Sequence, residues 1–377
     1  MAIKIAFVTN TCDHFSVKPF ERLSTKYDVD FYFTGGDERW RPKGNKSYRG
    51  NFKGTYLKKI NLLGLRITPG IFKLMFRPYD VFIKSFDDRF ALPVIFLMAK
   101  LKRTPFIFWS GTWSHPKTLF HRLSFIFTKF IYRFSEANLV YGEHIKRYLI
   151  DLKIDQKKIF VEHHAMDNDD FSQPVSQETK VKLKQKFNIT DEKIVLYVGR
   201  IEDCKGLQYL VEVIGLSKNL NCYLLFIGSG DLKEALEKEC KERNIKHCFL
   251  GYVPNEELRN YYGLADVFVL PSITTKTFKE PWGIVVNEAM NQGCPIVATD
   301  AVGAAAGGLV QQDRNGVIVP EADSVAMGRA LELLLGDDEL RARMSQASRE
   351  IIKEWSPQQM VVDFSRAIEF VYHQSKH

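Results

Sequence analysis

Two glutamates eight residues apart, Glu280 and Glu288, are the first residues whose spacing suggests chemistry. They lie between two short apolar runs rich in β-branched residues, at 267–270 and 296–299, and such runs are typical of buried strands. Pro281 suits the first position of a helix, so the pattern predicts a loop and a helix between two strands, with Glu280 at the mouth of the helix. Carboxylates roughly 12 Å apart along a helix cannot share a proton, but they can hold hydroxyl groups at two ends of one extended ligand.

The first backbone N–H groups of this predicted helix have no partner within the helix, so they favour an anion. A ligand with hydroxyl groups at both ends and phosphate in the middle is a sugar nucleotide. The N–H groups expected near its anionic middle are those of Trp282, Gly283 and Ile284.

Two cations follow an earlier predicted strand at 193–198. Gly199 and Arg200 come directly after this strand, and Lys205 comes five residues later. Strands of one parallel sheet end at the same edge, so we expect these side chains near the two glutamates. Fixed Arg and Lys can stabilise the charge that builds on a departing phosphate without a metal. An Arg and a Lys in a loop are usually only solvated. A phosphate-binding role is favoured here because the segment with the two glutamates follows a strand of the same sheet.

The charge of the chain is unevenly distributed. Residues 1–170 contain 29 Lys and Arg against 17 Asp and Glu, a balance of +12, whereas the remainder contains 24 against 28, a balance of −4. The first part also contains 20 of the 28 Phe. We therefore expect only this half to meet an anionic partner, such as an acidic membrane surface.

With 377 residues, the chain is long enough for two domains. Its six cysteines show no C-x-x-C spacing, which indicates free thiols in a reducing compartment. No signal peptide is evident, and the longest apolar run, 90–99, is about half of the roughly 20 residues that span a bilayer. These features predict a cytoplasmic protein, with peripheral contact to the inner face of a membrane left open.

Apolar strand-like runs alternate with helical patterns along the chain, which is typical of parallel α/β sheets. A polar tract interrupts the alternation, so we predict two domains, 1–170 and 171–356, and a last helix within 357–377. The strands expected are 3–8, 28–33, 79–84, 105–109, 138–141 and 158–162 in the first domain, and 193–198, 222–227, 248–252, 267–270 and 296–299 in the second.

The segment 116–134 shows an amphipathic helical pattern. A helix that packs on the core is favoured, because most amphipathic helices do so, and an interfacial helix on an acidic membrane is the alternative. The residues expected on the apolar face are Leu119, Phe120, Leu123, Ile126, Phe127, Phe130, Ile131 and Phe134.

Three further features of the first half have two interpretations each. The Gly- and Arg-rich loop 35–54 is read as solvated in preference to a phosphate-binding loop. His115 lies in a loop after a predicted strand, where a general base and a structural residue are equally favoured. Asp167 and Asp169 match the D-x-D that binds a metal in some sugar transferases, but the tract is better explained as a domain link, so no metal is expected.

The second half resembles glycosyltransferase family 4. The motifs are Gly199-Arg200…Lys205-Gly206, Phe226-Ile-Gly-Ser-Gly230, and Glu280-x7-Glu288 with Gly293-Cys-Pro-Ile-Val, within about residues 190–355. These are retaining transferases of the GT-B fold, so the resemblance implies two Rossmann-like domains whose parallel sheets face across a cleft. It also implies that the last helix returns to the N-terminal, acceptor-side domain. The sequence of this domain resembles the family only in outline.

The resemblance implies a role for each matched residue. Arg200 and Lys205 would hold the donor diphosphate, Glu280 would contact the donor sugar, and Glu288 would contact the ribose. The rest of the donor site would be formed by the loops at Gly199 and Gly228 and by the amides of Ile284 and Val285. The loop near Val253 would contact the base.

The function implied is that of a retaining, metal-independent, hexosyltransferase-like enzyme. It would move a sugar from a UDP- or GDP-sugar to the hydroxyl group of a sugar or lipid-linked acceptor, in glycan, polysaccharide or glycolipid synthesis, without a cofactor and without nucleic acid. The alternatives are a GT-B sugar-nucleotide epimerase and a non-catalytic regulatory protein that binds a sugar nucleotide.

Overall fold

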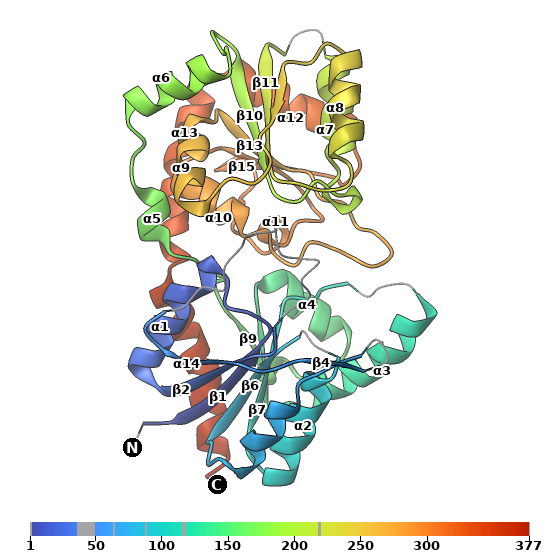
Figure 1. The fold of residues 1–377 in the computed structure, drawn as a ribbon, viewed down its shortest axis with the longest axis vertical. Helices are drawn as coiled ribbons and strands as arrows, with labels where there is room; N and C mark the ends of the chain where they lie inside the picture. The colour runs from blue at the N-terminus through green and yellow to red at the C-terminus, as the bar shows by residue number, and fades with distance from the viewer. Residues whose placement is uncertain are drawn as a thin grey trace. The chain divides into compact units, whose positions relative to one another are not determined.

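The computed structural model describes residues 2–35, 50–62, 65–86, 89–114, 118–217 and 220–376. The chain divides into two compact units, residues 1–167 with 355–377 and residues 168–354 (Figure 1). The domain boundaries predicted after residues 170 and 356 lie three and two residues further along the chain.

The first unit contains a seven-stranded sheet in the order β3-β2-β1-β6-β7-β8-β9, in which neighbouring strands pair in parallel. The strands of this unit are β1 Lys4–Thr9, β2 Asp28–Phe33, β3 Lys53–Tyr56, β6 Val81–Ser85, β7 Phe106–Ser110, β8 Ala137–Val140 and β9 Ile159–Val161, with a separate hairpin of β4 Ile60–Leu62 and β5 Leu65–Ile67. Its helices are η1 His14–Ser16, α1 Val17–Lys26, η3 Pro69–Phe76, α2 Ala91–Lys102, α3 Leu119–Phe134, α4 Glu143–Asp151, η4 Gln156–Lys158 and α14 Pro357–Gln374.

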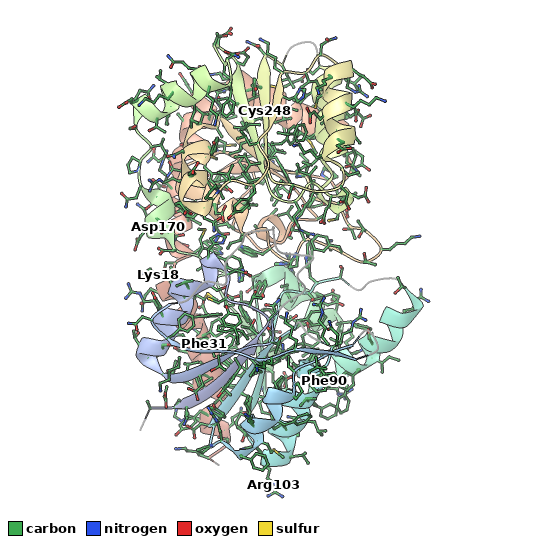
Figure 2. The ribbon with its side chains drawn as sticks, in the orientation of Figure 1. Lys18, Phe31, Phe90, Arg103, Asp170 and Cys248 are labelled. Carbon is green, nitrogen blue, oxygen red and sulfur yellow. The ribbon has the colours of Figure 1, made fainter. Side chains whose placement is uncertain are left out.

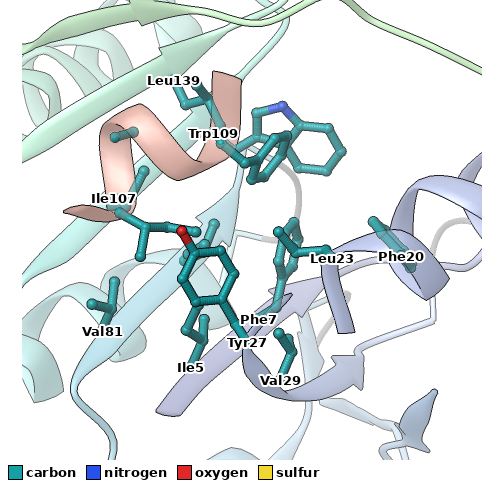
Figure 3. Packing of buried hydrophobic residues seen from close by; sticks show 14 of the residues in the cluster. Ile5, Phe7, Phe20, Leu23, Tyr27, Val29, Val81, Ile107, Trp109 and Leu139 are labelled. Carbon is teal, nitrogen blue, oxygen red and sulfur yellow. The ribbon is translucent and has the colours of Figure 1, made fainter. Parts of the chain in front are cut away.

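Aromatic and aliphatic side chains together form the core on one face of this sheet (Figure 3). The ring of Phe7 meets Trp109 edge-on at a centroid distance of 5.5 Å and stacks on Phe364 of α14 at 5.9 Å. The N-cap of α14 is Ser356, whose hydroxyl oxygen accepts the N–H of Gln359 at 3.2 Å. The end of the chain therefore contributes a core helix to the first unit.

The second unit contains a six-stranded sheet in the order β12-β11-β10-β13-β14-β15, again with parallel neighbours. Its strands are β10 Lys193–Val198, β11 Cys222–Ile227, β12 His247–Phe249, β13 Val267–Leu270, β14 Ile296–Thr299 and β15 Gly316–Val319. Its helices are α5 Asn168–Ser172, α6 Gln177–Lys186, η5 Asp203–Lys205, α7 Leu207–Leu216, α8 Lys233–Glu242, α9 Asn255–Leu264, α10 Val285–Asn291, α11 Gly303–Ala306, α12 Ser324–Gly336, α13 Asp338–Ile351 and η6 Ile352–Glu354.

Both sheets confirm the predicted α/β class with two Rossmann-like domains. Strands β10, β11, β13 and β14 have the predicted bounds, because each is a continuous apolar run that is almost entirely buried. All six cysteines lie among the described residues and are free thiols, as predicted. Burial raises the pKa of Cys222, Cys240 and Cys294 to about 12, so these three thiols are poor nucleophiles.

The helix predicted to start at Pro281 starts later, at Val285, so the prediction was wrong at this end. Glu280 instead forms an isolated parallel bridge with Val302, and Gly283 has a φ of +92°, a left-handed value that a helix does not use. The helical distance expected between the two glutamates therefore does not apply. Glu280 belongs to an extended loop that precedes α10.

The preferred interpretation of the segment 116–134, a helix that packs its apolar face on the core, is wrong for much of that face. Ile131 is fully buried, but Ile126, Phe127, Phe130 and Phe134 of α3 are between 46% and 69% exposed. Among the described residues no helix is long and apolar enough to cross a bilayer.

Candidate functional site

The chain order places a topological switch between β10 and β13 in the second unit. From β10 the chain continues to β11 and β12 on one side, and then returns to β13 on the other side. In open parallel sheets, ligands bind beyond the carboxyl ends of the two strands at such a point. The loops that follow β10 and β13 carry the residues singled out from the sequence.

Glycines let the loops after β10 and β11 approach each other closely. A Cβ atom on Gly228, whose φ is +136°, would lie 1.8 Å from the carbonyl oxygen of Gly199, and one on Gly230 would lie 2.1 Å from that of Ile201. The N–H of Ile201 donates to the carbonyl oxygen of Ser229 at 2.9 Å. This edge of the sheet is therefore formed by backbone, which leaves room for a bulky ligand to come near.

A buried ion pair joins the two loops of the switch point. Lys205, the last residue of η5, donates from Nζ to Oε2 of Glu280, and the two residues are only 8% and 7% exposed. The hydroxyl group of Ser272 donates to the same carboxylate oxygen at 3.0 Å, and the ammonium lies 5.3 Å from the ring centroid of Phe278. An ammonium has three N–H donors, and this bond to Glu280 occupies one of them.

The loop that carries Glu280 packs against the Ala- and Gly-rich segment 301–308. Gly303 and Ala304 of this segment are buried in α11. The N–H of Gly303 donates to the carbonyl oxygen of Glu280 at 3.2 Å, and the N–H of Ala304 donates to that of Trp282 at 2.7 Å. A Cβ on Gly303 would lie 2.0 Å from the carbonyl oxygen of Pro281. Small residues are required for this close packing, and they were the signal in the sequence.

Glu288 is also buried, at 1% exposure in α10. Tyr262 donates its hydroxyl proton to Oε2 of Glu288 at 2.6 Å. Burial, followed by the charge of Glu288, raises the pKa of Tyr262 well above its ordinary value, so the tyrosine remains a donor. In the preceding loop, Nε1 of Trp282 donates to Oδ1 of Asn287 at 2.8 Å. The two glutamates are therefore held rigidly by different partners.

Arg200 lies in the same edge loop and is partly exposed. It forms an ion pair with Glu202, and its carbonyl oxygen accepts the hydroxyl proton of Tyr197 at 2.5 Å. Burial and the nearby charge of Glu280 raise the pKa of Tyr197 well above its ordinary value. The remaining predicted residues are placed as follows: Val253 is buried after β12, Ile284 is the N-cap of α10, and Val285 is its first residue.

Two candidates in the first half of the chain have different outcomes. His115 lies outside the described residues. Asp169 lies in the first turn of the short helix α5, directly after the unit boundary at Asp167. Among the residues that the structure describes, no group of three or more His, Cys, Asp or Glu could hold a metal ion.

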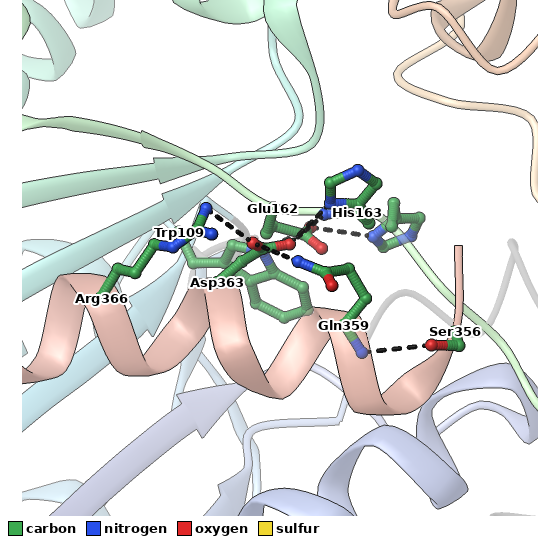
Figure 4. A network of polar contacts seen from close by, with 8 residues as sticks. Trp109, Glu162, His163, Ser356, Gln359, Asp363 and Arg366 are labelled. Atoms are coloured by element: carbon green, nitrogen blue, oxygen red, sulfur yellow. Dashed lines mark hydrogen bonds and ion pairs between the residues drawn. The ribbon is translucent and has the colours of Figure 1, made fainter. Parts of the chain in front are cut away.

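A polar cluster that the sequence did not single out lies beyond β7 and β9 in the first unit (Figure 4). Buried Glu162 accepts the indole N–H of Trp109 at 3.2 Å and contacts Nδ1 of His164 at 3.1 Å, while its Oε2 has no partner among the described residues. Buried Asp363 of α14 accepts the backbone N–H of His163 at 3.0 Å and lies 2.7 Å from its Nδ1. An acidic residue directly after an apolar strand, followed by two histidines, was the available signal.

Comparisons with known proteins agree with this architecture. Residues 179–351 match the family model for glycosyl transferases group 1. An uncharacterized glycosyltransferase of Methanocaldococcus jannaschii is 30% identical over 53% of this chain and 51% of its own length. The alpha-D-kanosaminyltransferase of Streptomyces kanamyceticus is 29% identical over 62% of this chain and 60% of its own length. The matches thus span about half the length of these relatives.

The solved structure of HepE from Anabaena in complex with UDP is similar over 97% of this chain and 100% of that chain, with a TM-score of 0.77 and 16% identity. The sucrose-phosphate synthase of Thermosynechococcus elongatus is similar over 99% of this chain and 100% of that chain, with a TM-score of 0.74 and 18% identity. The fold is therefore the two-domain GT-B fold of nucleotide-sugar glycosyltransferases. The match to the group 1 glycosyl transferases lies within the second unit, where the sequence motifs also lie.

Proposed function

We propose that this protein is a retaining glycosyltransferase that takes a sugar from a nucleoside diphosphate and transfers it to an acceptor hydroxyl group without a metal ion or cofactor. The observation that carries the proposal is the buried Lys205–Glu280 pair at the switch point of the second sheet. A buried carboxylate held against a cation at a ligand-binding edge provides, in one place, a partner for sugar hydroxyl groups and a partner for phosphate.

In the proposed complex, the donor lies along the edge formed by the loops after β10, β11 and β13. Lys205 and Arg200 contact the diphosphate, Glu280 accepts hydrogen bonds from the sugar, and Glu288 accepts those of the ribose. The amides of Ile284 and Val285, at the start of α10, donate toward the phosphates. The backbone at Gly199 and Gly228 leaves room for the phosphates, and the loop at Val253 meets the base.

Transfer then needs charge stabilisation more than a dedicated base. The acceptor oxygen bonds to the anomeric carbon on the face from which the nucleoside diphosphate leaves, and the bond from that carbon to the phosphate oxygen breaks. The acceptor proton passes to the departing phosphate oxygen. Lys205 and Arg200 stabilise the negative charge that develops on that oxygen, which is the role fixed donors fulfil best in a site that excludes water.

The acceptor is proposed to be a sugar or a lipid-linked hydroxyl compound bound by the first unit. Similar proteins include a lipopolysaccharide core biosynthesis glycosyltransferase of Rhizobium meliloti and an amylovoran biosynthesis glycosyltransferase of Erwinia amylovora. The basic composition of residues 1–170 supports an acceptor presented at an acidic membrane surface.

Nucleotide release provides the test. The protein is incubated with UDP- and GDP-sugars, alone and with a panel of sugar and lipid-linked acceptors. The nucleoside diphosphate released into solution is then measured. Release that requires an acceptor, with retained anomeric configuration in the product by NMR, is expected. Epimerised donor without release would indicate an epimerase, and donor binding without turnover would indicate a regulatory protein. Loss of activity in EDTA that only a divalent ion restores would contradict metal independence.

A further inference from the structure

An exposed apolar surface on the first unit has no part in the proposed reaction. It is formed by eight side chains from three helices, and we name it the η3–α2–α3 face. Its most exposed members, Phe76, Ile126 and Leu101, are 88%, 69% and 66% exposed. The eight residues are Phe72 and Phe76 of η3, Leu97 and Leu101 of α2, and Ile126, Phe127, Phe130 and Phe134 of α3.

Ring contacts show that α2 lies between the other two helices. Phe96 of α2 packs edge-on against Phe130 of α3 with 6.0 Å between ring centroids. Phe72 of η3 packs edge-on against Phe90, which directly precedes α2, at 6.1 Å. Phe90 is labelled in Figure 2.

Two lysines join the three helices again at the C-terminal end of α2. Lys100 Nζ donates to the carbonyl oxygen of Phe134 at 2.5 Å, and Lys102 Nζ donates to that of Met75 at 2.7 Å. Leu101 lies between these lysines in the sequence, so one end of each of the three helices lies near this point. Arg103, which is labelled in Figure 2, directly follows Lys102 at the end of α2.

The charges on these helices are of one sign. The three helices contain no Asp or Glu, and they contain six Lys and Arg. These are Lys73, Lys100, Lys102, Arg122, Lys129 and Arg133. Of these six, Lys100 is paired with Glu136, which follows α3. Exposed aromatic and aliphatic groups on helices with an excess of cations match a surface that is both apolar and anionic.

We propose that the η3–α2–α3 face binds the surface of a membrane that contains acidic lipid. The apolar side chains enter the boundary between headgroups and acyl chains, while the cations meet anionic headgroups. A second copy of the chain is a poor occupant, because the excess of cations on these helices would oppose the same excess on the other copy. The proposal does not rest on the proposed transferase activity, since lipid binding is measured without a donor or an acceptor.

Vesicle flotation of the full chain tests the apolar part. The triple variant Phe76→Gln, Leu97→Gln, Ile126→Gln is expected to bind vesicles of equal phosphatidylcholine and phosphatidylglycerol about tenfold more weakly than the wild type, because the groups that insert are lost. The matched control is Leu216→Gln, Val325→Gln, Leu333→Gln, which changes three exposed apolar residues of the second unit. The control is expected to bind like the wild type.

A second comparison tests the charge part. The triple variant Lys73→Ser, Arg122→Ser, Arg133→Ser is expected to lose about tenfold or more in binding, whereas Lys186→Ser, Lys276→Ser, Lys353→Ser in the second unit is expected to change little. Binding of the wild type should weaken at high salt and on vesicles of phosphatidylcholine alone. Unfolding midpoints of all variants, taken by circular dichroism, confirm that each is folded.

Three results would overturn the proposal. The first is flotation of the apolar triple variant equal to that of the wild type. The second is equal binding of the wild type to neutral and acidic vesicles. The third is a dimer in sedimentation velocity that the apolar substitutions convert to monomer while vesicle binding is unchanged, because a second copy would then cover the face.

Discussion

The two units share one architecture but differ in the features that mark their candidate binding surfaces. In the second unit, the charged residues of the candidate site are buried and paired, as with Lys205 and Glu280. In the first unit, apolar side chains form the core and also cover part of the surface on helices that carry an excess of cations. This contrast supports the proposals that the second unit binds a nucleotide sugar and that the first unit contacts a larger and more apolar partner.

The largest expected effect comes from the buried ion pair. Glu280→Gln keeps the shape of the side chain and its bond to Ser272 but removes the charge that faces Lys205 and the donor sugar. We expect a loss of transfer of roughly 10²–10³-fold, measured as acceptor-dependent nucleotide release, because a fixed charge at the reacting centre is lost. Vesicle flotation should not change. Near-normal transfer would refute the donor assignment, and Glu234→Gln, an exposed acid of the same unit, is the control.

The corresponding substitution in the first unit should affect stability instead. Asp363→Ala removes the buried partner of His163, Gln359 and Arg366, so we expect the free energy of unfolding to fall by about 3 kcal/mol. Denaturant unfolding followed by tryptophan fluorescence measures this change. Glu369→Ala on the same helix, which removes a half-exposed ion pair with Lys26, should cost less than about 1 kcal/mol.

Nucleotide affinity should be unchanged by Asp363→Ala, because the residue belongs to the first unit. Weaker nucleotide binding by this variant, in proportion to its instability, would contradict the division of roles between the units.

A smaller effect is expected at Glu288. Glu288→Gln keeps an acceptor for the hydroxyl group of Tyr262 but removes the charge proposed to hold the ribose. Because a hydrogen bond to a charged group contributes about 1.5–3 kcal/mol, we expect nucleotide affinity to fall by roughly 10- to 150-fold. Isothermal titration calorimetry with the nucleoside diphosphate measures this affinity in the wild type and the variant. Unchanged affinity would mean that Glu288 only supports the core.

The smallest effect concerns acid stability of the second unit. Glu192 accepts hydrogen bonds from Lys246 and from the N–H of Thr190, and Lys246 leads the causes that lower the pKa of Glu192 from 4.5 to about 2. A folded-state pKa below the unfolded value stabilises the fold above the unfolded pKa, and the gain is lost as pH falls from about 4.5 toward 2.

Glu192→Gln should therefore lower the unfolding midpoint by a few degrees near neutral pH and leave it nearly unchanged at the lowest pH. Thermal scans across this pH range measure the difference. A decrease of the same size at every pH would show that packing, not charge, is responsible.

Much of the fold could be predicted because each of the strands β10, β11, β13 and β14 is a continuous apolar run that is visible in the sequence. The buried runs of β10 and β13, and the glycines and charges after them, are visible in the sequence and lie together in the structure. The start of α10 was not predicted, because Pro281 permits a helix there, whereas the left-handed Gly283 and the bridge to Val302 prevent it. Such a long-range pairing leaves no local pattern.

The environment of a side chain was likewise not predictable. The amphipathic pattern of α3 shows which residues share a face, but it does not show what covers that face. The partners of Glu162 and Asp363 come from β7, α14 and the segment after β9, which are distant in the sequence. Only the assembled fold brings them together.

The most direct test of the central claim, a nucleotide-sugar site around Lys205 and Glu280, is a thermal-shift panel of UDP, GDP and their sugars on the wild type and Lys205→Met. At about 100-fold excess over its dissociation constant, the correct nucleotide should raise the unfolding midpoint of the wild type by roughly 5–10 °C. The shift should be largely absent in folded Lys205→Met. A panel in which no nucleotide stabilises the wild type, or a full shift in Lys205→Met, would contradict the account.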